Sequence, residues 1–172
     1  MRAHPSNAPA VELHPYLTFA VADEEYAIEV LRVREILAFV PLTKVPRAPQ
    51  FVSGVMNLRG TVVPVIDLRV KLGMEPTVVT PHTCIIIVEI VNDHGNTIMG
   101  LLTDDVKQVI DLAADDIEPP PSFGTKIDLT YLLGMGDLGD RFALILDIDR
   151  VLTALELIAA SNVAAEAEQA NA

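Results

Sequence analysis

The chain contains no tryptophan and only one cysteine, and aromatic residues make up only 5% of it. The single cysteine, Cys84, cannot form an internal disulfide, and its place in the apolar run 84–88 predicts a small buried side chain in a reducing compartment. Because 51% of the residues are hydrophobic while aromatics are few, aliphatic side chains must build the core. Short runs rich in valine and isoleucine favour β-strands.

Long hydrophobic runs are also missing. No apolar run reaches the roughly 18 residues of a membrane-spanning helix. Residues 1–14 lack the apolar segment of a secretory signal, and their prolines and polar residues predict a flexible tail. We therefore expect a cytoplasmic protein with no direct membrane insertion.

Positive charge is scarce, and the formal net charge is −12. This excludes nucleic acids and anionic membrane surfaces as general partners, because both would be repelled. The few cations are unevenly placed, since residues 32–71 hold seven basic residues against two acidic ones. Such a basic segment in an acidic chain fits an acidic protein partner, and chance segregation is the alternative.

Catalytic and cofactor motifs are absent as well. Residues 134–139 spell G-x-G-x-x-G, but a dinucleotide site needs a helix after this loop, and here a strand follows. The acidic groups around Asp104, Asp147 and 115–118 lack the spacing of a calcium loop, and the four histidines are scattered. We therefore expect no enzyme, no cofactor and no metal, and a protein that works by binding.

The most informative feature that is present is a hairpin at residues 52–69. Two apolar runs flank Arg59-Gly60, where glycine supplies the positive φ that a tight turn needs. Pro64 in the second run indicates an edge strand or a bulge. The turn holds Arg59 in solvent, where it suits a carboxylate of a protein partner. An ordinary solubilising turn residue is the alternative.

Other short apolar runs predict further strands along the chain, at 16–22, 26–30, 33–40, 83–91, 97–102, 106–112 and 141–148. Asp149 is the expected N-cap of a helix from about 149 to 161. The Ala/Glu-rich residues 162–172 are expected to fray.

The sequence also repeats itself. A displacement of 73 positions aligns Ile28, Val33, Ile36 and Pro46 with Leu101, Val106, Val109 and Pro119. A displacement of 80 aligns Gly54, Leu58, Ile66, Asp67 and Leu68 with Gly134, Leu138, Leu146, Asp147 and Ile148. Many short strands in two copies predict two similar β-barrels, with a single β-sandwich as the alternative. Arg59 aligns with Gly139, so the fold itself does not require an arginine there.

Taken together, these motifs resemble the CheW family of chemotaxis coupling proteins from about residue 16 to 157. The matching strings are Val33-Arg-Glu-Ile36, Val45-Pro-Arg-Ala-Pro49, Asn57-Leu-Arg-Gly60, Val63-Pro-Val-Ile-Asp-Leu-Arg69 and Ile145-Leu-Asp147. The resemblance implies an all-β fold without catalysis, made of two packed SH3-like five-stranded β-barrels with a short C-terminal helix. We expect a CheW-like domain at 15–157, divided into barrel 1 at about 23–82, barrel 2 at about 15–22 plus 83–148, and the helix.

The resemblance also implies partners. Family members bridge the cytoplasmic tip of methyl-accepting chemoreceptors to the regulatory domain of a CheA-type histidine kinase in membrane-associated arrays. The family's contact positions carry over onto Val33, Glu35, Arg59 and Gly60, and Phe123 matches an aromatic linked to ring contacts. Glu35 and Arg59 could pair with each other or each meet a partner charge. Phe123 could instead cap its own barrel.

Two other functions stay open at the level of sequence. The acidic loops could make this a small-molecule or metal-binding β-barrel, or the chain could be the adaptor-like module of a larger kinase or phosphatase. Ala27 stands where the family commonly has glycine, and residues 73–81 contain no basic residue. These departures leave the pathway open among flagellar chemotaxis, twitching motility and surface sensing.

Overall fold

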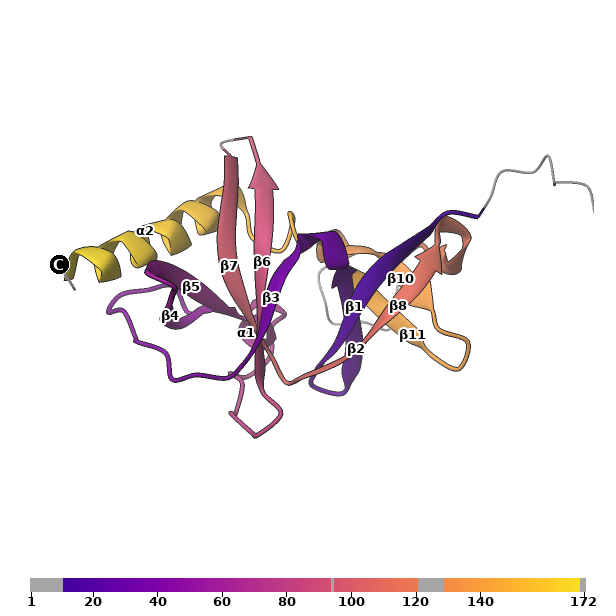
Figure 1. The fold of residues 1–172 in the computed structure, drawn as a ribbon, viewed down its shortest axis with the longest axis horizontal. Coiled ribbons are helices and arrows are strands. Elements are labelled where there is room, and N and C mark those ends of the chain that lie inside the picture. Colours follow the sequence, from indigo (N-terminus) through magenta and orange to yellow (C-terminus); the bar gives the residue numbers. More distant parts are fainter. Residues whose placement is uncertain (1–10, 94, 121–128, 171–172) are drawn as a thin grey trace, which may run out of the picture.

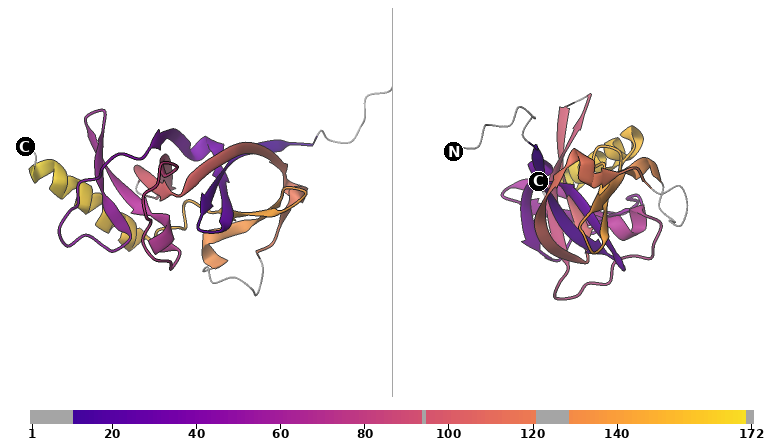
Figure 2. Two further views of the ribbon diagram at one scale, coloured as in Figure 1. Left: turned by 90° about the horizontal axis from the view of Figure 1, so that it is seen from below. Right: turned by 90° about the vertical axis from the view of Figure 1, so that its right-hand side faces the viewer.

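The computed structural model describes residues 11–93, 95–120 and 129–170. The strands form two curved sheets that lie next to each other along the long axis of the molecule, with one long helix, α2, against the first (Figures 1 and 2). Each sheet curls into an SH3-like barrel, so the all-β expectation is confirmed.

The first barrel has the strand order β3-β6-β7-β5-β4. Its strands are β3 (Val33–Ala38), β4 (Val52–Leu58), β5 (Thr61–Asp67), β6 (Cys84–Asn92) and β7 (Gly95–Thr103). The second barrel has the order β8-β1-β2-β11-β10-β9. Its strands are β1 (Leu13–Val21), β2 (Glu24–Glu29), β8 (Asp105–Ala113), β9 (Ile117–Glu118), β10 (Leu132–Asp137) and β11 (Phe142–Leu146). The helical segments are η1 (Val30–Arg32), α1 (Leu68–Lys71), η2 (Ala114–Asp116), η3 (Leu129–Tyr131) and α2 (Ala154–Ala170).

The internal repeat is visible in the strand register. The parallel pair Val65 with Gly100 in the first barrel corresponds to the parallel pair Ile145 with Ala27 in the second. The β3–β6 ladder shifts register between Val33 and Glu35, and the β1–β8 ladder shifts at the corresponding point, between Thr18 and Phe19. The two barrels therefore share not only an order of strands but also the position of a bulge.

The division of the chain between the barrels differs from the expected one. β2 falls inside the expected barrel 1, but it pairs with β1 and β11 in the second barrel. The β6–β7 hairpin, expected in barrel 2, pairs with β3 and β5 in the first. Each barrel thus takes one hairpin from the other sequence copy. The two hairpins have the same apolar pattern, so sequence alone does not decide which barrel each one completes.

Most of the hydrophobic core belongs to both barrels together. The largest cluster of buried side chains contains Phe19, Tyr26 and Ile28 from the second barrel and Ile66 and Leu101 from the first. Two smaller clusters fill the individual barrels; one is built around Met56, Val63, Val65, Ile85, Ile87 and Leu102, and the other around Tyr16, Ala27, Leu112, Ala143 and Ile145. Because the shared cluster is the largest, the two barrels pack as one body.

Helix α2 begins later and ends later than the sequence predicts. Thr153 and Glu156 form a capping box, in which Thr153 Oγ1 accepts from the Glu156 N–H at 3.1 Å and Glu156 accepts from the Thr153 N–H at 2.9 Å. Asp149, the expected N-cap, instead accepts from the Val91 N–H at 3.0 Å. The segment expected to fray is helical to Ala170 because Val163 and Ala167 are buried against the shared core.

The expected N-terminal tail is only partly covered by the described residues. Residues 1–10 lie outside them, whereas Leu13 and His14 already belong to β1 and pair with Ala113 and Leu112.

Candidate functional site

The β4–β5 hairpin ends in a two-residue turn made by Arg59 and Gly60, between the paired residues Leu58 and Thr61. Both turn residues have positive φ, 49° for Arg59 and 87° for Gly60. This matches a type I′ turn, which follows the twist of its flanking strands. The Asn57 side chain accepts a hydrogen bond from the Gly60 N–H at 2.8 Å and fixes the turn.

The backbone conformation of Arg59 is unfavourable for an arginine. A residue with a Cβ in the left-handed region is less stable there than glycine by about 1 kcal/mol. The aligned residue of the second barrel is Gly139, with φ of 95°. The first barrel therefore carries an arginine at a position where glycine is the more stable choice. Backbone strain of this kind at a surface turn indicates a functional role for the Arg59 side chain.

Arg59 forms an ion pair with Glu35 of β3. Both Nη atoms donate to Oε2 of Glu35, at 2.8 and 2.6 Å. β3 and β4 are the two edge strands of the first sheet, so the pair connects the two edges where the barrel closes. The side chains of Arg59 and Glu35 are 69% and 30% exposed, and such a pair contributes only about 0–1 kcal/mol to stability. The ion pair therefore orients Arg59 more than it stabilises the barrel.

The other sequence-predicted contact residues occupy different surroundings. Val33 lies two residues before Glu35 on β3, pairs with Val88 and packs against the shared core, so it is half-buried. The structure thus brings Glu35, Arg59 and Gly60 together and places Val33 beside them. Phe123 lies outside the described residues.

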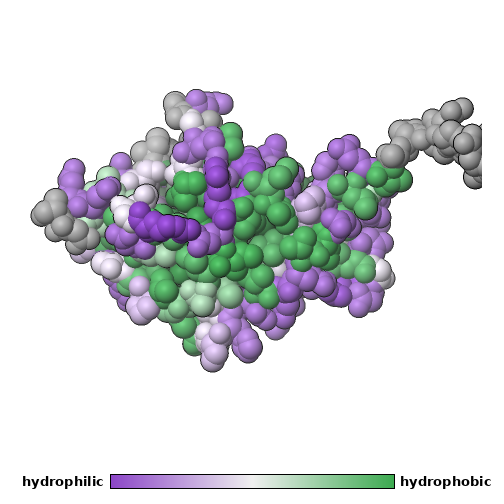
Figure 3. Space-filling view, in the orientation of Figure 1, coloured by the Kyte–Doolittle hydropathy of each residue, from purple (hydrophilic) through white to green (hydrophobic). Residues whose placement is uncertain are grey.

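An exposed apolar surface runs along the same edge of the first barrel. Leu31 is 84% exposed, Ile36 44% and Val40 38%, on η1, on β3 and just beyond it. Figure 3 shows apolar surface across the middle of the face that carries β3. Sequence reasoning missed this surface; the strand pattern at 33–40 offered a signal, because Ile36, Ala38 and Val40 are apolar at outward positions. Contiguous exposed apolar side chains mark protein interaction surfaces.

Lys71 forms a buried polar centre between the barrels. Its Nζ lies 5.5 Å from the ring centre of Phe51 and 5.2 Å from that of Tyr131, and it donates to Glu156 of α2 at 2.5 Å. The Lys71 side chain is only 9% exposed. Burial is the largest single influence and opposes its charge, but the interactions with Glu156 and Tyr131 together outweigh burial and raise the pKa of Lys71. Burial is likewise the largest single influence on Glu156 and opposes its charge, but the interactions with Lys71 and Thr153 together outweigh burial and lower the pKa of Glu156. The centre therefore fastens α2 to both barrels.

The two aspartates that the repeat aligns, Asp67 and Asp147, both form local hydrogen bonds. Asp67 is buried and accepts from the Arg69 N–H at 3.0 Å and the Thr77 N–H at 2.9 Å. Asp147 accepts from the Asp149 N–H at 3.1 Å. Both carboxylates therefore hold the chain where it leaves a barrel strand.

The structure also bears on metal binding and on membrane-spanning helices. Among residues 11–93, 95–120 and 129–170, no three histidine, cysteine, aspartate or glutamate side chains are grouped so that they could hold a metal ion. No helix within the same residues has the length and apolar character needed to cross a bilayer. The G-x-G-x-x-G string lies on β10 and its turn, and a Cβ at Gly134 would lie 2.5 Å from the Glu118 carbonyl oxygen. Its first glycine therefore serves strand packing.

Comparisons with known proteins match this architecture. Residues 15–156 match the family model of the CheW-like domain. The chain is 36% identical over 149 residues to the chemotaxis protein CheW of Klebsiella aerogenes, covering 87% of each protein. It is 35% identical to that of Helicobacter pylori, covering 82% of each. The crystal structure of the scaffolding protein TtCheW from Thermoanaerobacter tengcongensis matches with a TM-score of 0.73 and 33% identity, over 81% of this chain and 92% of that one.

Proposed function

The chain belongs to the CheW-like domain family, and we propose that it is a non-enzymatic adaptor in a chemosensory array. In this role it couples the cytoplasmic tip of methyl-accepting chemoreceptors to the regulatory domain of a CheA-type histidine kinase. It acts in the cytoplasm, at membrane-associated arrays. The names of its relatives support this role, because they are chemotaxis proteins and one is described as a scaffolding protein.

The observation that carries the proposal is the Arg59 turn. An arginine in a left-handed conformation, held by Glu35 and 69% exposed, presents a cation in a fixed direction. A pre-oriented arginine is well suited to bind a partner's carboxylate, because little side-chain freedom is lost on binding. The exposed apolar residues Leu31 and Ile36 provide surface for burial beside it.

The proposal assigns partner contacts to Val33, Glu35, Arg59, Gly60 and Phe123. Val33 supports β3 from the inside, and Gly60 gives the turn its shape. Glu35 has a double task, since it holds Arg59 and presents a carboxylate of its own. The partner contact of Phe123 is proposed from the family resemblance alone.

Reconstitution tests the proposal. Receptor-containing membranes and a CheA-type kinase are mixed with and without this chain, and kinase autophosphorylation and co-sedimentation are measured. We expect the kinase to enter the pellet, and receptor control of its output to appear, only when the chain is present. Unchanged output together with no co-sedimentation would refute the adaptor role.

A variant and a matched control locate the contact. Arg59→Ala should remain folded and weaken co-sedimentation. Arg150→Ala removes a cation that is also 69% exposed and ion-paired, to Asp147 near the second barrel. We expect this control to behave as the unmodified chain. Equal effects of the two variants would show that loss of a surface cation, rather than the Arg59 turn, is responsible.

A further inference from the structure

Most of the positive charges in the described residues are neutralised locally. Within the described part of the chain, eight basic side chains form an ion pair with an acidic one: Arg32, Arg34, Arg59, Arg69, Lys71, Lys107, Arg141 and Arg150. Among the same residues, Lys44 and Arg47 are the two without such a partner. They lie on one loop between β3 and β4, in a chain with a net charge of −12. Two unpaired cations on one loop of an acidic chain make a locally positive surface, which attracts anionic groups of a partner.

The loop of Lys44 and Arg47 lies between two cavities. One, of about 320 Å³, is lined by Lys44, Gln50 and Ser53 and by the start of β4. The other, of about 390 Å³, lies between the loop and α2 and has the apolar Val45, Pro46 and Ala167 in its wall, together with Arg47 and one acidic residue, Glu166. Polar groups and apolar side chains thus alternate along the loop, which suits a ligand with both characters.

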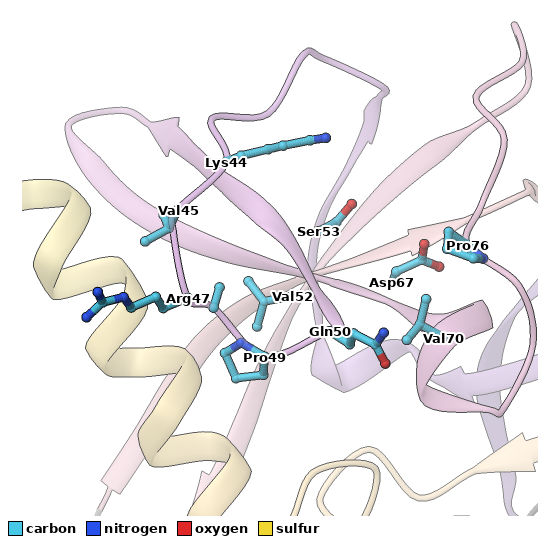
Figure 4. A pocket seen from close by; sticks show the side chains of 11 residues that line it. Lys44, Val45, Arg47, Pro49, Gln50, Val52, Ser53, Asp67, Val70 and Pro76 are labelled. Atoms are coloured by element: carbon cyan, nitrogen blue, oxygen red, sulfur yellow. The ribbon is translucent and has the colours of Figure 1, made fainter.

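Arg47 is held in an unfavourable conformation, as Arg59 is. Its φ is 64°, and it has a Cβ, so its backbone is strained in the left-handed region. In Figure 4, Lys44 reaches over the first cavity toward Ser53, while Arg47 points to α2. The strained backbone of Arg47 therefore goes together with a side chain that points away from Lys44. Retained strain at a surface loop is characteristic of a binding site.

We propose that the loop 43–50 is a docking site for an acidic, partly apolar segment of a protein partner. An extended segment that crosses the loop can place one carboxylate near Lys44, another near Arg47, and an apolar side chain against Val45 and Pro46. Because the two cations point in different directions, one small anion such as phosphate does not satisfy both. The net negative charge of the whole chain disfavours an anionic membrane.

This site is separate from the Arg59 turn. Val52 and Ser53, which line the first cavity, lie at the start of β4, and Arg59 follows its end. Arg59 lies six positions after Ser53 along this strand and its turn, about 20 Å at the usual rise. The proposal therefore adds a second contact surface to the first barrel and does not rest on the adaptor role.

Binding of a defined peptide tests the site. Fluorescence anisotropy is measured at low ionic strength with a fluorescein-labelled peptide of repeated Leu-Glu-Glu units, and with a Leu-Gln-Gln peptide as control. We expect the acidic peptide to bind and the neutral one not to bind. The double variant Lys44→Glu/Arg47→Glu should weaken binding by about tenfold or more. The matched variant Lys107→Glu/Arg150→Glu has the same net charge and alters cations outside the first barrel, so it should change affinity less than about twofold.

A second variant separates binding from folding. Arg47→Gly removes the cation and relieves the positive φ, so it should unfold at the same temperature or higher while binding the peptide more weakly. An equal loss in the matched control variant would overturn the proposal, because it would show only general electrostatics. So would a wild-type chain that does not bind the peptide, or one that instead binds inorganic phosphate or phosphatidylserine vesicles through Lys44 and Arg47. None of these outcomes depends on receptor or kinase.

Discussion

The two barrels of this protein share a framework and differ at one tip. In the first barrel, Glu35 on β3 pairs with Arg59 in the β4–β5 turn. At the aligned positions of the second barrel stand Gln108 and Gly139, which carry no charge. There the backbone N–H of Gln108 donates to the Thr18 hydroxyl at 3.2 Å. What the barrels have in common serves the fold, and the ion pair that one barrel adds is a candidate for function.

The shared framework is specific in its details. The Asp67 N–H donates to the Phe51 carbonyl at 2.8 Å, and the Asp147 N–H donates to the Tyr131 carbonyl at the same distance. Gly54 and Gly134 are also equivalent: a Cβ at Gly54 would lie 2.7 Å from the Thr43 carbonyl oxygen, and one at Gly134 2.5 Å from that of Glu118. In both barrels, a short chain segment therefore pairs closely with the strand that carries the glycine, through Thr43 with Val55 in the first barrel and Glu118 with Met135 in the second.

The largest effects are expected from these glycines. Gly54→Ala and Gly134→Ala each force a Cβ against backbone that cannot move aside, and each should destabilise the protein by about 3 kcal/mol. Urea unfolding measures both. If only one of the two variants lowers the free energy of unfolding, the barrels do not share this packing.

Removal of the cation between the barrels should have the next largest effect. Lys71→Met leaves Glu156 without its partner and removes the contacts with Phe51 and Tyr131, so we expect a loss of about 2 kcal/mol in the free energy of unfolding. Lys107→Met is the control, because Lys107 is 46% exposed in its pair with Asp105, and it should change stability by less than about 0.5 kcal/mol. If both variants lose the same stability, Lys71 does not fasten the barrels together.

Acidification should weaken the same link. Because the pKa of Glu156 is lowered below its usual 4.5, its charge adds stability above that pH, and the contribution is lost as pH falls through the lowered value. The difference in unfolding free energy between the unmodified chain and Glu156→Gln should therefore be largest near about pH 6 and shrink below the usual pKa. A difference that is independent of pH would contradict this account.

Exchange of the tip residues should have smaller and unequal effects. Arg59→Gly relieves the positive φ and loses the ion pair, so stability should stay within about 1 kcal/mol of the unmodified chain. Gly139→Arg introduces strain without an acidic partner and should destabilise by about 1 kcal/mol. Thermal unfolding of the two variants measures the contrast, and a large loss for Arg59→Gly would assign Arg59 to the fold.

The smallest effect tests whether the ion pair can be transplanted. Gln108→Glu together with Gly139→Arg recreates in the second barrel the pair of the first. A double-mutant cycle should give a favourable coupling of about 0.5 kcal/mol. A coupling of zero would mean that the two tips differ in geometry as well as in sequence.

Much of the fold could be predicted from the sequence, because strand runs and the repeat are local or internal signals. The repeat aligned the hairpin that contains Gly54 with its equivalent at Gly134, and it separated Arg59 from the framework. The exchange of hairpins could not be predicted. Whether β6–β7 completes one barrel or the other depends on packing over the whole chain, and both choices bury the same apolar pattern.

The sequence predicted which residues form the candidate site, but it did not predict their backbone conformation. Sequence placed Glu35 and Arg59 together as one possibility, and the structure shows the pair. It gave no sign that Arg59 itself has positive φ, because glycine was the residue expected to supply it. The end of α2 was missed for a related reason: Val163 and Ala167 stabilise the helix through contacts with a distant barrel.

The exchange of hairpins has a consequence for how the chain folds during synthesis. β1 and β2 leave the ribosome before the other strands, yet their neighbours in the sheet, β8 and β11, are made only after the whole first barrel. The first barrel is contiguous from β3 to β7 and can form while β1 and β2 wait unpaired at their outer edges. Such non-local pairing slows folding and leaves apolar strands exposed. Pulse-labelled hydrogen exchange should therefore protect β3 to β7 before β1 and β2.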